Sequence, residues 1–221
     1  MARMTDYSLP FGVHLYFTGT FGSREVTEDS FRNLVTQITT TPIKTIEELW
    51  RVVDNIPSFL DANDGFTYYW FKEGKSVTWE SEDNSNGAVY SYSHEEDEQL
   101  IKSNPLHWAQ VKADLEGRAL ALLSLFVGCS LPEFTNLVNG LLFKVRRTRI
   151  SYELWLHKEP SPDERRLLDQ CLSAALQIDG AKARHIHLKT TRDLISRSQT
   201  SSRRSSRAPS EERSRTHKRS R

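Results

Sequence analysis

Hydrophobic positions recur along the chain with two different spacings, one typical of strands and one typical of helices. Alternation, or enrichment in β-branched and aromatic residues, predicts strands over residues 12–18, 31–39, 66–71, 88–93, 140–146, 150–156 and 182–189. Helical spacing of apolar residues predicts helices over 45–55, 111–127 and from 161 to a stop at Gly180. The acidic stretch 94–104 has no clear pattern and is expected to be a loop. Strands with three long helices between antiparallel runs favour an α+β fold, a sheet with helices on one face.

Two helices carry start signals. Thr45 and Glu48 have capping-box spacing, and Pro57 stops that helix. Ser161 is followed by Pro162 at the first helical position and by Glu164 at the third, which is the pattern of a helix N-terminus. In the first helix, one face is expected to carry the apolar residues Ile46, Leu49, Trp50 and Val53.

The run 140–156 predicts a hairpin with an unusual polar face. Its core face carries alternate apolar residues of both strands. The opposite face carries Trp155 and Glu153 on the second strand, next to Lys144 and Arg146 on the first. An exposed Trp on the polar face of a strand requires an explanation, since large aromatic side chains are mostly buried. A ligand-binding role is one such explanation.

A second aromatic residue adjoins a carboxylate at residues 79 and 80. Trp79 follows a strand and a Lys-Glu-Gly turn, and Glu80 comes directly after it. An indole can stack on a purine while a carboxylate accepts N–H groups from the edge of the base. The pair therefore indicates a guanine site, although a Trp-Glu pair at a strand end is more often core plus surface.

Charge and composition separate a globular domain from a tail. The segment 196–221 has eight Arg, Lys218 and nine Ser against two Glu, so it carries +7, and residues 1–195 carry −6. The tail lacks aromatic and large aliphatic residues and is expected to be disordered. Attraction to RNA, phosphorylation, a nuclear address or a merely solubilising extension all remain open for it.

Several function classes are not favoured. The sequence has no GxGxxG or GxxxxGK[ST] loop and no nucleophile–base motif, so a nucleotide-hydrolysing enzyme is not expected. The one pair with metal-ligand spacing, His185-x-His187, is more often structural or close to RNA than a ligand. Cys129 and Cys171 are widely spaced, which is typical of reduced cytosolic thiols. No apolar run could span a bilayer, and no signal-peptide core follows the first Met.

Four segments resemble the translation initiation factor 4E family, which binds the 5′ cap of messenger RNA. They are Val-His-Leu-Tyr-Phe from residue 13, Thr-Ile-Glu-Glu-Leu-Trp from residue 45, the block 68–80 ending in Trp-Glu, and Lys-Val-Arg at 144–146 with Trp155 nine residues later. The resemblance covers roughly residues 7–195. It implies a curved antiparallel sheet with about three helices on the convex face and the cap in the concave cleft.

The resemblance also implies roles for individual residues. Trp79 would be one side of an aromatic sandwich around 7-methylguanine, Glu80 would accept the N1–H and N2–H of the base, and Trp155 would touch the N7-methyl side. The cap phosphates would meet Arg146, with Lys144 and Arg149. On the convex face, a Tyr-(x)4-Leu-Φ helix from a 4G-type scaffold or a 4E-binding protein would bind Ile46, Trp50 and Leu120.

The chain departs from the family pattern at several positions. The second sandwich Trp is missing; Phe31 is the nearest match, with Tyr16 and Phe21 as alternatives. A family Lys falls on Ser151, and its charge could come from Arg147, Arg149, Lys189 or Arg192. Residues 94–111 resemble an insertion of about a dozen residues. Together these features indicate a divergent member of the family.

The expected function is cap binding and recruitment of a scaffold for translation initiation, without catalysis, cofactor or metal. The expected protein is cytoplasmic, with a nuclear location also open, and monomeric apart from its partner. The alternative is a partner-binding regulator of translation with weak or lost cap affinity.

Overall fold

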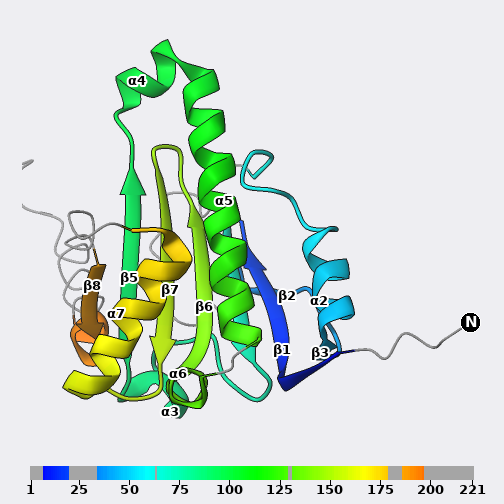
Figure 1. Ribbon diagram of the computed structural model, residues 1–221, viewed down its shortest axis with the longest axis vertical. Helices are drawn as coiled ribbons and strands as arrows, with labels where there is room; N and C mark the ends of the chain where they lie inside the picture. The colour runs from blue at the N-terminus through cyan, green and yellow to red at the C-terminus, as the bar shows by residue number, and fades with distance from the viewer. Residues whose placement is uncertain (1–6, 20–33, 63, 129–130, 179–185, 197–221) are drawn as a thin grey trace, which may run out of the picture.

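A computed structural model describes residues 7–19, 34–62, 64–128, 131–178 and 186–196, and they build one curved antiparallel sheet (Figure 1). The strand order is β2-β1-β4-β6-β7-β5-β8, and β3 also pairs with β1. The strands are β1 (Ser8–Thr18), β2 (Thr36–Gln37), β3 (Ile43–Thr45), β4 (Thr67–Lys72), β5 (Ala88–Glu95), β6 (Val138–Val145), β7 (Arg149–Leu156) and β8 (Ile186–Thr190).

The longer helices lie against one face of this sheet, which confirms the expected α+β class. Figure 1 shows α5 and α7 crossing the same face, while α2 lies beside β1 and β3. The helices are α2 (Ile46–Val53), α3 (Glu82–Ser85), α4 (Glu98–Ser103), α5 (Pro105–Val127), α6 (Pro132–Leu137) and α7 (Pro162–Leu176), and residues 191–196 are also helical.

Both expected helix starts are confirmed, and each is a capping box. The Thr45 side chain accepts from the backbone N–H of Glu48, and the Glu48 carboxylate accepts from the backbone N–H of Thr45. Ser161 and Glu164 exchange the same two hydrogen bonds at the start of α7. These bonds satisfy N–H groups that the first helical turn cannot pair.

The structure differs from the expected elements at three places. The strand expected over 31–39 is reduced, within the described residues, to the two residues of β2. The segment 94–104 is not a loop, because Asp97 caps α4 by accepting from the N–H groups of Gln99 and Leu100. Helix α7 ends before Gly180, since Gln177 takes a left-handed conformation with φ 51°.

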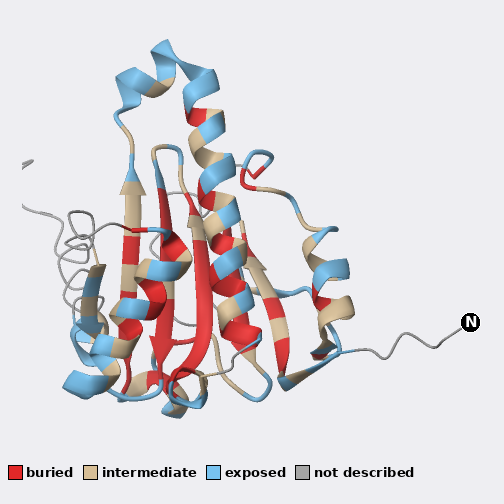
Figure 2. Cartoon of the chain, viewed as in Figure 1, coloured by how far each residue is buried: buried red, intermediate tan, exposed pale blue. Residues whose placement is uncertain are grey.

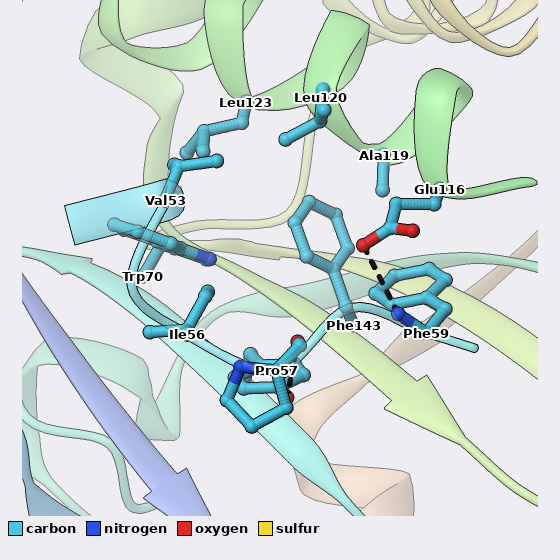
Figure 3. A pocket seen from close by; sticks show the side chains of 11 residues that line it. Val53, Ile56, Pro57, Phe59, Trp70, Glu116, Ala119, Leu120, Leu123 and Phe143 are labelled. Carbon is cyan, nitrogen blue, oxygen red and sulfur yellow. Dashed lines mark hydrogen bonds between the residues drawn. The ribbon is translucent and has the colours of Figure 1, made fainter. Parts of the chain in front are cut away.

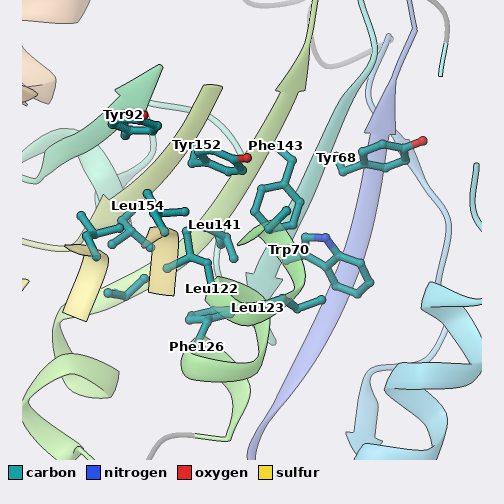
Figure 4. Close-up of a cluster of buried hydrophobic side chains, with 14 of the residues drawn as sticks. Tyr68, Trp70, Tyr92, Leu122, Leu123, Phe126, Leu141, Phe143, Tyr152 and Leu154 are labelled. Atoms are coloured by element: carbon teal, nitrogen blue, oxygen red, sulfur yellow. The ribbon is translucent and has the colours of Figure 1, made fainter. Parts of the chain in front are cut away.

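The helix-covered face of the sheet carries the main core. Figure 4 shows Trp70, Phe143 and Tyr152 of the sheet directed toward Leu122 and Phe126 of α5. In the hairpin β6–β7, all the residues assigned to the core face by their alternation are buried here: Leu141, Phe143, Val145, Ile150, Tyr152, Leu154 and Leu156. Figure 2 shows this buried band along the central strands and the exposed surface of α4.

The described residues lack two further kinds of feature. No helix among them combines the length and the apolar character needed to cross a membrane. No three His, Cys, Asp or Glu side chains in the same part of the chain are grouped so as to hold a metal ion.

Candidate functional site

The sheet face opposite α5 and α7, which we call the open face, carries a second, separate apolar cluster. Its buried members come from four strands and its partly buried members flank them. The open-face cluster consists of buried Tyr69, Phe71, Val89, Leu142 and Trp155, with partly buried Tyr16, Val77, Trp79 and Leu194. Trp79 and Trp155 are thus brought together although 76 positions separate them in the sequence.

Trp155 lies on the expected face, but the expectation that it is exposed is wrong. It is only 3% exposed. Its ring packs edge-on against Phe71, with centroids 5.4 Å apart, and lies tilted against Trp79, with centroids 5.7 Å apart. The indole N–H donates to Oε2 of Glu153 over 3.3 Å. Phe71 and Trp79 cover this indole. Because they belong to other segments of the chain, the alternation along β7 could not predict the burial of Trp155.

A glycine in β6 makes room for the aromatic packing around Trp155. Gly140 pairs with Phe71 on one side and with Trp155 on the other. A Cβ at this position would lie 2.6 Å from the Phe71 ring. Phe71 therefore occupies the space that a side chain at residue 140 would take, and from there it supports the Trp155 ring.

The loop that carries Trp79 and Glu80 is held by buried amides that the sequence reading missed. The Asn84 side chain, 1% exposed, donates to the carbonyls of Ser76 (2.8 Å) and Thr78 (2.9 Å). Asn139 in turn donates to Oδ1 of Asn84 over 3.0 Å. The run Asn-Ser-Asn-Gly at 84–87 is typical of a turn, but nothing in it indicates these hydrogen bonds.

This anchoring positions the purine-binding candidates. Trp79 is half-buried and Glu80 is exposed directly after it. The indole therefore has packing support from the open-face cluster, while the carboxylate can still be reached from solvent. A buried amide network of this kind restricts the loop, because breaking it would leave polar groups without partners.

Two of the three cations expected at the phosphates, Lys144 and Arg146, are already engaged. Lys144 Nζ lies 2.5 Å from Oε1 of Glu153. The Arg146 guanidinium donates to the carbonyls of Phe66 and Val145, each over 2.9 Å. Burial lowers the pKa of Arg146, but a guanidinium stays charged at neutral pH. Arg149 lies exposed at the start of β7.

The second stacking aromatic stays a prediction. Phe31 and the alternative Phe21 lie outside the described residues. Tyr16 lies on the open face, where it pairs directly with Tyr69 and packs against the open-face cluster. Burial raises the pKa of Tyr16, so its phenol is neutral at physiological pH.

The residues expected to bind a partner lie on α2 and α5. Trp50 is 37% exposed although it shares a face with Leu49 in the helical pattern, and Leu49 is the buried residue of the helix. Ile46 and Leu120 are partly buried. An exposed Trp on a short helix is available for contact with another molecule.

Helices α2 and α5 meet at a small cavity (Figure 3). Leu120 and Val53 line it from the two helices, and Trp70 lines it from the sheet. Beside it, Glu116 of α5 accepts from the backbone N–H of Phe59 over 3.0 Å, and burial raises the pKa of Glu116. The cavity measures about 30 Å³, enough for one water molecule.

Comparison with known proteins relates this chain to one family. The family model described as "Eukaryotic initiation factor 4E" matches residues 14–206. Translation initiation factor 4E of Saccharomyces cerevisiae is 24% identical over 131 residues, which are 59% of this chain and 54% of the yeast protein. Factor 4E-3 of Caenorhabditis elegans is 26% identical, over 61% of this chain and 50% of that protein. The matches thus span about half the length of these curated relatives.

Solved structures agree in fold. The complex of C. elegans eIF4E-3 with the 4E-binding protein Mextli has a TM-score of 0.71 at 20% identity, covering 86% of this chain and 96% of that one. Ascaris suum eIF4E-3 with the m7G cap has a TM-score of 0.67 at 21% identity, covering 84% and 92%. Schistosome eIF4E, complexed with m7GpppG and 4E-BP, scores 0.67 at 16%, covering 86% and 92%. The family model covers most of the chain and the fold agrees, so this protein belongs to the eukaryotic initiation factor 4E family.

Proposed function

We propose that this protein binds the 7-methylguanosine 5′ cap of messenger RNA on the open face of its sheet. The observation that carries the proposal is the anchored Trp79-Glu80 pair: a half-buried indole supported by Trp155, followed directly by an exposed carboxylate. The A. suum relative solved with the m7G cap supports the same ligand for this fold.

The chemistry of the pair fits a methylated guanine. Methylation at N7 makes the base cationic, so stacking on an indole gains a cation–π contribution of about 0.5–2 kcal/mol. The Glu80 carboxylate accepts the N1–H and N2–H groups of guanine, and adenine lacks this pair of donors. Binding of this kind requires no covalent step, cofactor or metal.

The remaining contacts follow from position. Phe31, or Tyr16 or Phe21 in its place, stacks on the other side of the base. Trp155 supports Trp79 and borders the methyl group. Arg149, Arg146 and Lys144 supply positive charge for the triphosphate, of which Arg149 is the most exposed.

The helical side of the molecule recruits a partner. Trp50, with Ile46 and Leu120, binds a Tyr-(x)4-Leu-Φ helix of a 4G-type scaffold or of a 4E-binding protein. The exposure of Trp50 supports this assignment. The C. elegans relative solved with Mextli and the schistosome relative solved with 4E-BP support the class of partner. Cap and scaffold together place the protein in cytoplasmic translation initiation.

A second candidate function is a partner-binding regulator with weak cap affinity. The pairing of Lys144 with Glu153 favours it, because a neutralised cation attracts a triphosphate less strongly. In this case a helical 4G-type peptide still binds, while 7-methyl-GTP binds weakly.

The deciding experiment is a titration of intrinsic Trp fluorescence with 7-methyl-GTP and with GTP. We expect quenching at lower concentrations of the methylated nucleotide. Equal responses to both nucleotides, or no response to either, would contradict cap binding. Repeating the titration on Phe31→Ala tests the second stacking aromatic, because loss of that ring should weaken 7-methyl-GTP more than GTP.

A further inference from the structure

Glu153 has a central place on the open face. Both of its carboxylate oxygens have a partner: Oε1 lies 2.5 Å from Lys144 Nζ, and Oε2 accepts the indole N–H of Trp155 over 3.3 Å. The side chains of Lys144 and Glu153 are 25% and 15% exposed. The pair is thus partly shielded from water, and its charges interact more strongly than an ion pair on an open surface would.

Strand register explains why these groups meet. Glu153 lies opposite Leu142 in β6, and Lys144 lies two positions further along β6. The two charged residues are therefore diagonal neighbours on one face, within reach of each other's long side chains. Trp155 is two positions from Glu153 in β7 and so shares its face.

The carboxylate influences its surroundings beyond this ion pair. Burial raises the pKa of Tyr69, and the negative charge of Glu153 acts in the same direction. Arg146 does not replace the charge of Lys144, since its guanidinium holds the carbonyls of Phe66 and Val145. Glu153 therefore offsets the charge of Lys144 on the face that also carries Trp155.

We propose that Glu153 is a specificity-determining residue that weakens the attraction of the open face for phosphate chains by neutralising Lys144. This inference rests on the proposed function in that the phosphates belong to a cap nucleotide. As a consequence, the affinity of the site depends more on the methylated base than on the number of phosphates. The same carboxylate accepts the indole N–H of Trp155. Glu153 therefore affects both the aromatic side of the proposed base site and the charge available to the phosphates.

Glu153→Gln separates these two roles. A Gln side chain can still accept the Trp155 N–H through its amide oxygen, but it carries no charge. We expect Glu153→Gln to bind 7-methyl-GTP about three- to tenfold more tightly at low salt, because one unit of opposing charge is removed near a polyanion. The gain for 7-methyl-GMP should be smaller, since it carries fewer phosphates. Added salt should reduce the gain.

Lys144→Met combined with Glu153→Gln is the matched control. If Glu153 acts through Lys144, the double variant should bind 7-methyl-GTP no more tightly than Lys144→Met alone, because no cation is left for Glu153→Gln to release. A gain of the double variant over Lys144→Met that equals the gain of Glu153→Gln over the unchanged protein would overturn the proposal, as would a gain of Glu153→Gln that is equal for 7-methyl-GMP and 7-methyl-GTP. Thermal unfolding of each variant shows whether the fold is kept. If Glu153→Gln does not fold, Lys144→Met alone tests the same ion pair: it leaves the Glu153 charge unpaired, so 7-methyl-GTP should lose more affinity than 7-methyl-GMP, and equal losses would overturn the proposal.

Inorganic tripolyphosphate separates this inference from cap binding itself. It has no base, so tighter binding to Glu153→Gln than to the unchanged protein supports charge control even if 7-methyl-GTP and GTP are not distinguished. The opposite result is also informative. If the protein distinguishes 7-methyl-GTP from GTP, but Glu153→Gln changes the affinity for neither nucleotide nor for tripolyphosphate, the role of Glu153 is refuted and cap binding is left intact.

Discussion

The indole rings of Trp79 and Trp155 lie with their centroids 5.7 Å apart and their planes tilted by 48°. One ring is half-buried in a loop and the other is almost fully buried in β7. The two aromatic residues of the proposed cap site therefore differ in structural role: Trp79 is available to a ligand, and Trp155 supports it.

This difference predicts two distinct mutant phenotypes. Trp79→Ala should lower 7-methyl-GTP affinity by about 5- to 150-fold, because stacking on a base contributes about 1–3 kcal/mol, with little change in melting temperature. Trp155→Ala should lower affinity and also destabilise the fold by about 3–5 kcal/mol, as large-to-small core substitutions do. Titration and thermal unfolding measure both. Equal destabilisation by the two substitutions would contradict the assignment.

Gly140 should tolerate no side chain. Gly140→Ala places a methyl group against the Phe71 ring and should destabilise the protein by about 1–3 kcal/mol, with weaker 7-methyl-GTP binding because Phe71 supports Trp155. Gly117→Ala is the matched control: nothing lies within 4 Å of a Cβ there, and Ala in a helix should stabilise by about 1 kcal/mol. Urea unfolding of both variants distinguishes a packing effect from a general effect of Gly replacement.

Loss of the buried amide at residue 84 should release the loop that carries Trp79. Asn84→Ala leaves the carbonyls of Ser76 and Thr78 without their donor, which costs about 1–3 kcal/mol. We expect faster amide hydrogen exchange in residues 76–81 and weaker nucleotide binding. Asn86→Ala, at an exposed neighbouring position, should change neither quantity. Unchanged exchange in Asn84→Ala would show that the amide does not hold the loop.

The partner site should respond independently of the cap site. Trp50→Ala should abolish capture of a Tyr-(x)4-Leu-Φ peptide while leaving 7-methyl-GTP binding intact, because Trp50 lies on α2 and outside the open-face cluster. Trp79→Ala should show the reverse behaviour. Leu106→Ala removes another apolar side chain, 84% exposed on α5, and should bind the peptide as the unchanged protein does. Peptide capture that survives Trp50→Ala would place the partner elsewhere.

Acid should remove the contribution of the α7 capping box. The Lys158 ammonium, followed by the backbone N–H of Ser161, lowers the pKa of Glu164 from 4.5 to about 2. A depressed carboxyl pKa stabilises the fold above about pH 4.5, and this contribution is lost as the pH falls through about 2. Since Glu164 is near the surface, Glu164→Gln should cost only about 0.5 kcal/mol at pH 7. Urea unfolding should show that difference shrinking between pH 4.5 and 2; a constant difference would contradict the assignment.

Much of the fold could be predicted because its signals are local. The alternation in β6 and β7 assigned every core-facing residue of that hairpin to the correct side, and capping boxes identified the starts of α2 and α7. The start of α4 was missed because its cap, Asp97, lies in an acidic stretch without an apolar period. A helix that projects from the sheet buries little apolar surface, so its sequence carries little of the pattern on which prediction depends.

The sequence by itself determined the fold class, the faces of the strands and the adjacency of Trp79 and Glu80, because each depends on neighbours in the chain. Only the tertiary structure decided that Trp155 is buried, that Lys144 is paired with Glu153, and that Asn84 and Asn139 hold the loop. Those features require segments from different strands to meet in one register. Charge and aromatic pattern showed which groups could form a site, and the register of the sheet determined which of them are left for a ligand.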